Sequence, residues 1–214
     1  EQARRTGARL GKAAVESLPT LVPARGEPFC FAHKTVEIQC QPMPTQAELE
    51  SLRNEWQAYV DRLEYDPTNT WFCGTNLPEQ FTVEQKIAIV ATNMKWLNEG
   101  VRMLDAGEKP RTSLPFTVGA VRIGDVAAAW SPGENFTETG MKVRNRSPFA
   151  HTLVCGDTNG LFGYIATDIE IDRGGSEPDR NWKTVYLEGF RLPPAKGAAD
   201  LIVNTAVELL NDLR

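Results

Sequence analysis

The chain has 214 residues and a formal net charge of −5. This length suits one domain with a substantial core and hardly two, because domains usually run to about 100 to 200 residues. The negative charge and the lack of a Lys/Arg stripe argue against a nucleic-acid partner, and no apolar run approaches the roughly 18 to 20 residues of a transmembrane segment.

Residues 1–18 predict a helix whose pattern is present from the first residue, Glu1, and they show no signal-peptide pattern. Small and apolar side chains recur at helical spacing along one stripe, and such stripes are normally buried. The stripe comprises Ala3, Gly7, Leu10, Ala14 and Leu18.

Residues 29–40 alternate in polarity, as a half-buried strand does. If this strand is continuous, the alpha carbons of Cys30 and Cys40 lie about 33 Å apart, far beyond disulfide reach. None of the four cysteines forms a Cys-x-x-Cys pair, so the cysteines indicate neither a disulfide scaffold nor a structural zinc site.

Two capping boxes predict the starts of two helices that pack on each other or on a sheet. Thr45 with Glu48 opens the first, and Thr82 with Gln85 opens the second, which ends at Gly107. The predicted buried stripes are Leu49, Leu52, Trp56, Val60 and Leu63, followed by Ile87, Val90, Met94, Leu97, Val101 and Leu104.

The second half of the chain alternates strands and helices. Residues 117–130 predict two short strands around a tight turn at Gly124 and Asp125. The following elements are a helix over 136–145, strands over 151–155 and 161–167, and a last helix with Ala199, Ile202, Ala206, Leu209 and Leu213 on its inner face. This order predicts an α/β (α+β) fold in which helices layer a mixed sheet.

Glu134 lies between a strand and a helix, in the stretch WSPGENFTETG. It could cap that helix, although Asn135 or Thr137 would serve better. Alternatively, Gly133 lets the chain turn so that the carboxylate reaches a cleft as a metal ligand or general base.

Tyr164 follows the turn-forming segment GDTNG, residues 156–160. A tyrosine in a strand is most often part of the core, and it becomes a metal ligand only where a cation stabilises its phenolate. His33 and His151 show no metal-ligand spacing, so the chain by itself offers no complete zinc site.

Three stretches together resemble the C-terminal half of the catalytic domain of neutral/alkaline (non-lysosomal) ceramidases and their bacterial relatives. They are AVRIGDVAAAWSPGENFTETG, SPFAHTLVCGDTNGLFGYIAT and LPPAKGAADLIVNTAVELLNDL. The resemblance covers residues 115–214 and continues more loosely into the N-terminal helix. It implies that residues 1–214 are a single domain or the C-terminal chain of a larger ceramidase-like domain.

The resemblance also implies a zinc ion held by Glu134, by Tyr164 and by two histidines from an N-terminal half. By the same resemblance, Gly133, Asn159 and Ser176 are the expected substrate-binding positions. The family's tyrosine that steadies the reacting carbonyl falls on Ser176, whose shorter side chain disfavours ceramide itself as the substrate, unless Tyr186 takes that place.

Two functions follow from this resemblance. The first is the C-terminal chain of a zinc-dependent hydrolase that cleaves an amide or related acyl bond of a small molecule or lipid with a metal-activated water. Its partner would be the N-terminal chain or segment of the same precursor, cut just before Glu1 and joined through a large apolar interface.

The second function is a metal-free binding or structural subunit, which Leu161 and Ser176 favour because both depart from the family pattern. The resemblance favours a periplasmic or secreted location. A third possibility is an unrelated α/β domain.

Overall fold

The computed structural model describes residues 1–24, 26–184 and 189–214. Its centre is a four-stranded sheet with the strand order β1-β4-β5-β7. β1, β4 and β5 pair antiparallel and β7 pairs parallel with β5, which confirms the predicted mixed sheet. The strands are β1 (Phe29–Gln39), β4 (Ser113–Ile123), β5 (Val126–Trp130) and β7 (His151–Cys155).

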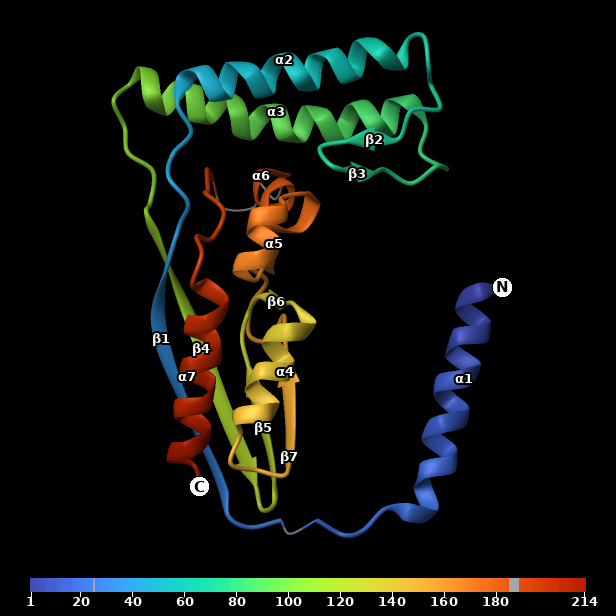
Figure 1. Ribbon diagram of the computed structural model, residues 1–214, viewed down its shortest axis with the longest axis vertical. Helices are drawn as coiled ribbons and strands as arrows, with labels where there is room; N and C mark the ends of the chain where they lie inside the picture. Colours follow the sequence, from blue (N-terminus) through green and yellow to red (C-terminus); the bar gives the residue numbers. More distant parts are fainter. Residues whose placement is uncertain (25, 185–188) are drawn as a thin grey trace.

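Two helices cover one face of this sheet, which we call the covered face (Figure 1). α7 (Ala198–Asp212) packs across β1, β4 and β5, and α4 (Thr137–Arg146) packs against α7 and β7. The predicted inner face of the last helix is confirmed except at its end, where Leu213 is only partly buried. The buried side chains between sheet and helices include Ile38, Leu114, Phe116, Val118, Ala120, Ala127, Ala129, Ile202, Ala206 and Leu210.

The helices α2 (Gln46–Leu63) and α3 (Val83–Asp105) run side by side at one end of the sheet (Figure 1). Both predicted capping boxes are present, because Thr45 with Glu48 and Thr82 with Gln85 exchange the expected hydrogen bonds. This hairpin has a core of its own, formed by Leu49, Trp56, Tyr59, Leu63, Phe72, Leu77, Val90, Trp96, Leu97 and Leu192.

The predicted burial of Ile87 is wrong, since this side chain is 39% exposed. Its neighbour Lys86 is buried instead, at 1% exposure, and its ammonium group donates a hydrogen bond to the Pro67 carbonyl at 2.8 Å. A lysine can bury its aliphatic stem when the charged end finds an acceptor, so the buried stripe of α3 passes through a residue that polarity alone would place outside.

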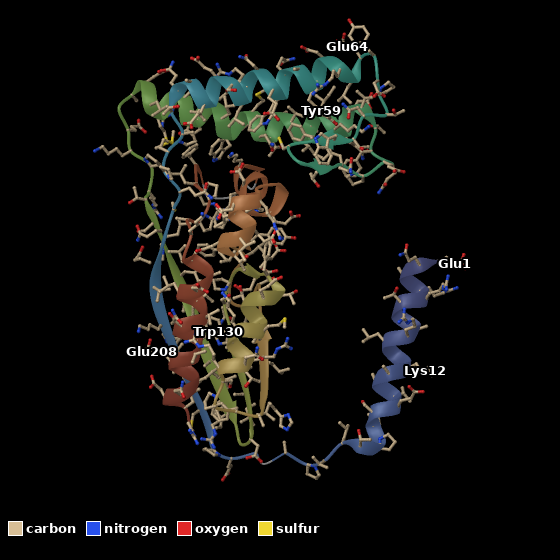
Figure 2. All side chains as sticks on the ribbon, in the orientation of Figure 1. Glu1, Lys12, Tyr59, Glu64, Trp130 and Glu208 are labelled. Carbon is tan, nitrogen blue, oxygen red and sulfur yellow. The ribbon has the colours of Figure 1, made fainter. Side chains whose placement is uncertain are left out.

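The N-terminal helix α1 (Gln2–Ser17) lies apart from the rest of the molecule (Figure 1). It forms as predicted, but none of its residues is buried, and Leu10 on the predicted stripe is 73% exposed. Figure 2 shows that the side chains of α1, including Lys12, reach no other element. The expected burial of this stripe is therefore wrong for the described residues.

Cys30 and Cys40 form no disulfide with each other, because the straight run of β1 separates them. No helix in the described ranges combines the length and apolarity that a membrane crossing needs.

The remaining elements are short. The predicted strand over 161–167 is reduced to two residues that pair outside the main sheet. These elements are η1 (Leu18–Thr20), β2 (Trp71–Phe72), β3 (Thr75–Asn76), β6 (Glu134–Asn135), β8 (Tyr164–Ile165), α5 (Asp168–Arg173), η2 (Ser176–Arg180) and α6 (Asn181–Thr184).

Candidate metal centre

The short strands β6 and β8 bring Glu134 and Tyr164 together. The two strands pair in parallel, with Glu134 directly opposite Tyr164. Backbone hydrogen bonds hold this register: the Glu134 N–H donates to the Gly163 carbonyl at 3.0 Å, and the Phe162 N–H donates to the Pro132 carbonyl at 2.8 Å. Residues opposite each other on paired strands project from the same face, so the two side chains are neighbours.

Gly133 occupies a position where a side chain would not fit. An added Cβ would lie 2.6 Å from Ile165 Cγ1 and 3.0 Å from Phe116 Cζ. Gly156 closes in from the other side, because its own Cβ would lie 2.8 Å from the Gly133 carbonyl oxygen. The two glycines therefore let three backbone segments approach one another closely around Glu134. This is a packing reason for Gly133, and its part in substrate binding stays a prediction.

Glu134 points away from the covered face. The next residue, Asn135, lines the space beneath the helices beside Val118 and Ile202. Successive side chains of a strand point to opposite sides, so Glu134 points away from the space that Asn135 lines.

The Glu134 carboxylate acts electrostatically on the Tyr164 hydroxyl. Hydrogen bonding to Glu134, partial burial and the negative charges of Glu134, Glu177 and Asp157 all raise the pKa of Tyr164 above its ordinary value. Each of these effects disfavours the phenolate while no cation is bound. A divalent cation between the two oxygens would reverse the effect, because the same carboxylates would attract the ion and the ion would stabilise the phenolate.

Aromatic packing and a hydrogen bond fix the position of Tyr164. Its ring meets Phe136 edge-on, with 6.2 Å between ring centroids, and the Trp182 indole N–H donates to the Tyr164 carbonyl at 2.8 Å. The phenol is therefore held on a rigid support rather than on a loop that would have to close.

The interpretation of Glu134 as a helix cap is wrong. The N-cap of α4 is Phe136, and no side chain makes a cap hydrogen bond there. Asn135 and Thr137, the other proposed caps, do not serve either, and the Asn135 amide donates to Ser131 Oγ at 2.7 Å instead. The carboxylate of Glu134 is thus left to interact with Tyr164.

The predicted substrate-binding positions are spread over two segments. Asn159, with a φ of 61°, lines a cavity of ≈ 520 Å³. The other lining residues are Phe31, His33, Pro115, Thr117, Trp130, Pro132 and Phe162. Ser176 begins η2, but its side chain lies outside the described part of the structure, as does the whole of Tyr186.

The histidines do not join the Glu134–Tyr164 pair. His33 lies on β1 and His151 begins β7, the two outer strands of the main sheet, and both are exposed. Within the described ranges, no group of three or more His, Cys, Asp and Glu side chains is arranged to hold a metal ion. Glu134 and Tyr164 could therefore supply two oxygen donors, one fewer than the protein ligands of a typical catalytic zinc site.

Asp157 and Glu177, whose charges act on Tyr164, were not among the predicted site residues. Asp157 lies in the turn-forming segment before Tyr164, and that segment could have indicated it. Glu177 lies in η2, where no sequence pattern indicated a site. Comparison of the chain with protein-family models, with curated proteins and with solved structures finds no match.

Proposed function

We propose that this chain is the C-terminal part of a zinc-dependent hydrolase of the ceramidase superfamily, acting on an amide or related acyl bond. Glu134 and Tyr164 would hold the metal from this side. The remaining donors, expected to be two histidines, would come from an N-terminal chain or segment of the same precursor.

One observation carries this proposal: a carboxylate and a phenol lie opposite each other, in register, on two short strands that pair with one another. A glutamate and a tyrosine in contact offer the oxygen donors that zinc accepts, and Asp157 and Glu177 add negative charge around them. The residues present fit one half of a metal shell, which agrees with the resemblance in requiring donors from elsewhere.

Zinc, when bound, would acidify a water molecule and polarise an acyl carbonyl. The residues of this chain would hold a metal-binding side chain in place and enclose part of the substrate. Phe136 and Trp182 would keep Tyr164 in place, and the aromatic cavity beside Asn159 would receive an apolar part of the substrate.

A second candidate function is a metal-free binding or structural subunit. The neutral state of Tyr164 favours it, because the Glu134 carboxylate raises the pKa of the phenol and disfavours the phenolate that a metal would need. Leu161, which departs from the family pattern, is 60% exposed and contributes no donor at this position.

Metal analysis of the assembly purified from its native cells tests the two functions. We expect zinc in the wild-type assembly, and its loss in Glu134→Gln and in Tyr164→Phe, each of which removes one oxygen donor with little change in shape. Glu138→Gln is the matched control, because Glu138 is an exposed glutamate on α4 close to Glu134 in sequence.

A wild-type assembly that contains no zinc would favour the metal-free subunit. Zinc that is retained in both Glu134→Gln and Tyr164→Phe would contradict the proposed ligands. Circular dichroism of each variant separates loss of the metal from loss of the fold.

A further inference from the structure

The main sheet has a second face that no helix of the described residues covers, and we call it the open face. Alternation along the strands places Phe31 and Leu153 on this face, where they are 70% and 62% exposed. By contrast, Phe116 and Ala129 on the covered face are each 1% exposed. An antiparallel sheet with one solvated face normally carries polar side chains there.

One end of the open face is instead apolar across the four strands, whereas its other end carries Thr35, Glu37 and Thr117. The strand register aligns Phe31, Val121, Ala128 and Leu153 in one row. The next row consists of Phe29, Ile123, Val126 and His151. One complete apolar row beside a row with three apolar residues is typical of the inside of a sandwich rather than of a surface that meets water.

A tryptophan lies along the middle of this face. The indole of Trp130 lies over Gly119 on the neighbouring strand, so that a Cβ added at Gly119 would lie 2.2 Å from the ring. Figure 2 places Trp130 within the sheet region. The glycine makes room for the ring, which lines a cavity together with Phe31.

The open face runs on into the candidate metal centre. Trp130 and Pro132 line the same cavity of ≈ 520 Å³, and the chain continues directly to Glu134, which lies opposite Tyr164. Beyond the apolar rows, the carboxylates of Glu134, Asp157 and Glu177 gather around Tyr164. The surface is therefore apolar over the strands and acidic at the end where two metal donors lie.

The size of this surface suits a stable interface. Strands lie about 4.8 Å apart and rise about 3.3 Å per residue, so four strands over about eight residues present roughly 500 Å². A layer laid on this face would bury about 1,000 Å² over both partners, the lower limit for a specific complex.

We propose that the open face is the docking surface for a separate polypeptide layer, which covers the Phe31 row and brings histidine donors to Glu134 and Tyr164. This inference rests on the proposed function, because it assigns the missing metal donors to the partner that buries the apolar rows. The acidic end of the face calls for a partner that is neutral or cationic there, and a histidine-bearing polypeptide with a bound cation meets that requirement.

Hydroxyl-radical footprinting of the isolated chain and of the assembly from native cells, read by mass spectrometry, tests the docking surface. We expect oxidation of Phe31, Leu153 and Trp130 in the isolated chain and its loss in the assembly. Tyr65, which is 88% exposed beyond the end of α2, should be oxidised equally in both.

Charged variants make the test specific. Phe31→Asp and Leu153→Asp should each release the partner, because a carboxylate would be buried without a counter-charge. Tyr65→Asp is the matched control and should keep the partner. All three variants should fold alone, since each changes an exposed side chain.

Four outcomes would overturn the inference. The first is protection of the open face in the isolated chain, which would mean that α1 covers it, and the second is an assembly whose intact masses show only a second copy of this chain. The third is retention of the partner by both charged variants. The fourth is a footprint on α2 and α3 in place of the open face. Zinc measured on the same samples separates the two proposals. Protection without zinc upholds the docking surface and removes the metal site, whereas zinc without protection does the reverse.

Discussion

The helical hairpin α2–α3 and the four-stranded sheet bury their apolar side chains to different degrees. In the hairpin, Leu49, Trp56 and Leu97 are all at most 1% exposed, and both helices begin with complete capping boxes. The sheet buries one face beneath α7 and α4 and leaves Phe31 on the other face 70% exposed. The hairpin is thus complete within this chain, whereas the sheet has the composition of a layer with a neighbour on both sides. The Glu134–Tyr164 pair belongs to the incomplete region.

Truncating a phenylalanine on each face of the sheet should give the largest contrast. Phe116→Ala, on the covered face, should cost about 3 to 5 kcal/mol of stability because it leaves a cavity against Gly133 and Phe162. Phe31→Ala, on the open face, should cost less than about 1 kcal/mol in the isolated chain, because its side chain already meets water. Urea unfolding of the isolated chain measures both, and similar losses would show that the open face is covered.

Adding a methyl group to a glycine near each face should give the next effect. Gly133→Ala should cost about 1 to 3 kcal/mol, because Ile165 and Phe116 leave the new Cβ no space. Gly119→Ala should cost less, about 1 kcal/mol, because the partly exposed Trp130 indole can move into solvent. Chemical unfolding gives the two losses, and near-UV circular dichroism should change more for Gly119→Ala, where a tryptophan is displaced. An equal or larger cost at Gly119 would mean that Trp130 is held in place.

Capping contrasts the hairpin with the helix next to the candidate site. Thr82→Ala should cost about 1 kcal/mol, because the Thr82 hydroxyl accepts a hydrogen bond from the Gln85 N–H. Thr137→Ala, in the first turn of α4, should stay within about 0.5 kcal/mol, since no side chain caps that helix. Thermal unfolding of the two variants in one buffer compares them, and a larger loss at Thr137 would restore a capping role to that segment.

The smallest expected effect is a pH dependence that distinguishes the two capping boxes. The Thr45 backbone N–H, and then its hydroxyl, donate hydrogen bonds that hold the pKa of Glu48 below its ordinary value. A carboxyl group whose pKa is lower in the folded state stabilises the fold above its unfolded pKa, and this contribution is lost as the pH falls through the folded pKa. Between about pH 5 and about pH 3, wild type should therefore lose slightly more stability than Glu48→Gln, which copies the uncharged Gln85 of the other box. Identical urea midpoints across this range would show that the carboxylate adds nothing.

Most of the secondary structure could be predicted from the sequence, because its signals are local. The Thr45–Glu48 and Thr82–Gln85 boxes mark helix starts through hydrogen bonds within one turn. Gly124 marks the β4–β5 turn, where its φ of 58° suits a residue without a Cβ. Ile87 and Lys86 show where local signals fail, because the Pro67 carbonyl that accepts from Lys86 comes from another part of the chain.

The sequence by itself determined the order of helices and strands, the mixed α/β character and the alternation that gives each strand two faces. Only the tertiary structure decided which face α7 covers, that α1 has no buried residue, and that Glu134 lies opposite Tyr164. The physical reason is the distance along the chain over which each interaction acts. Capping and alternation act over a few residues, whereas the β6–β8 pairing depends on a close approach that Gly133 and Gly156 permit between segments distant in the chain.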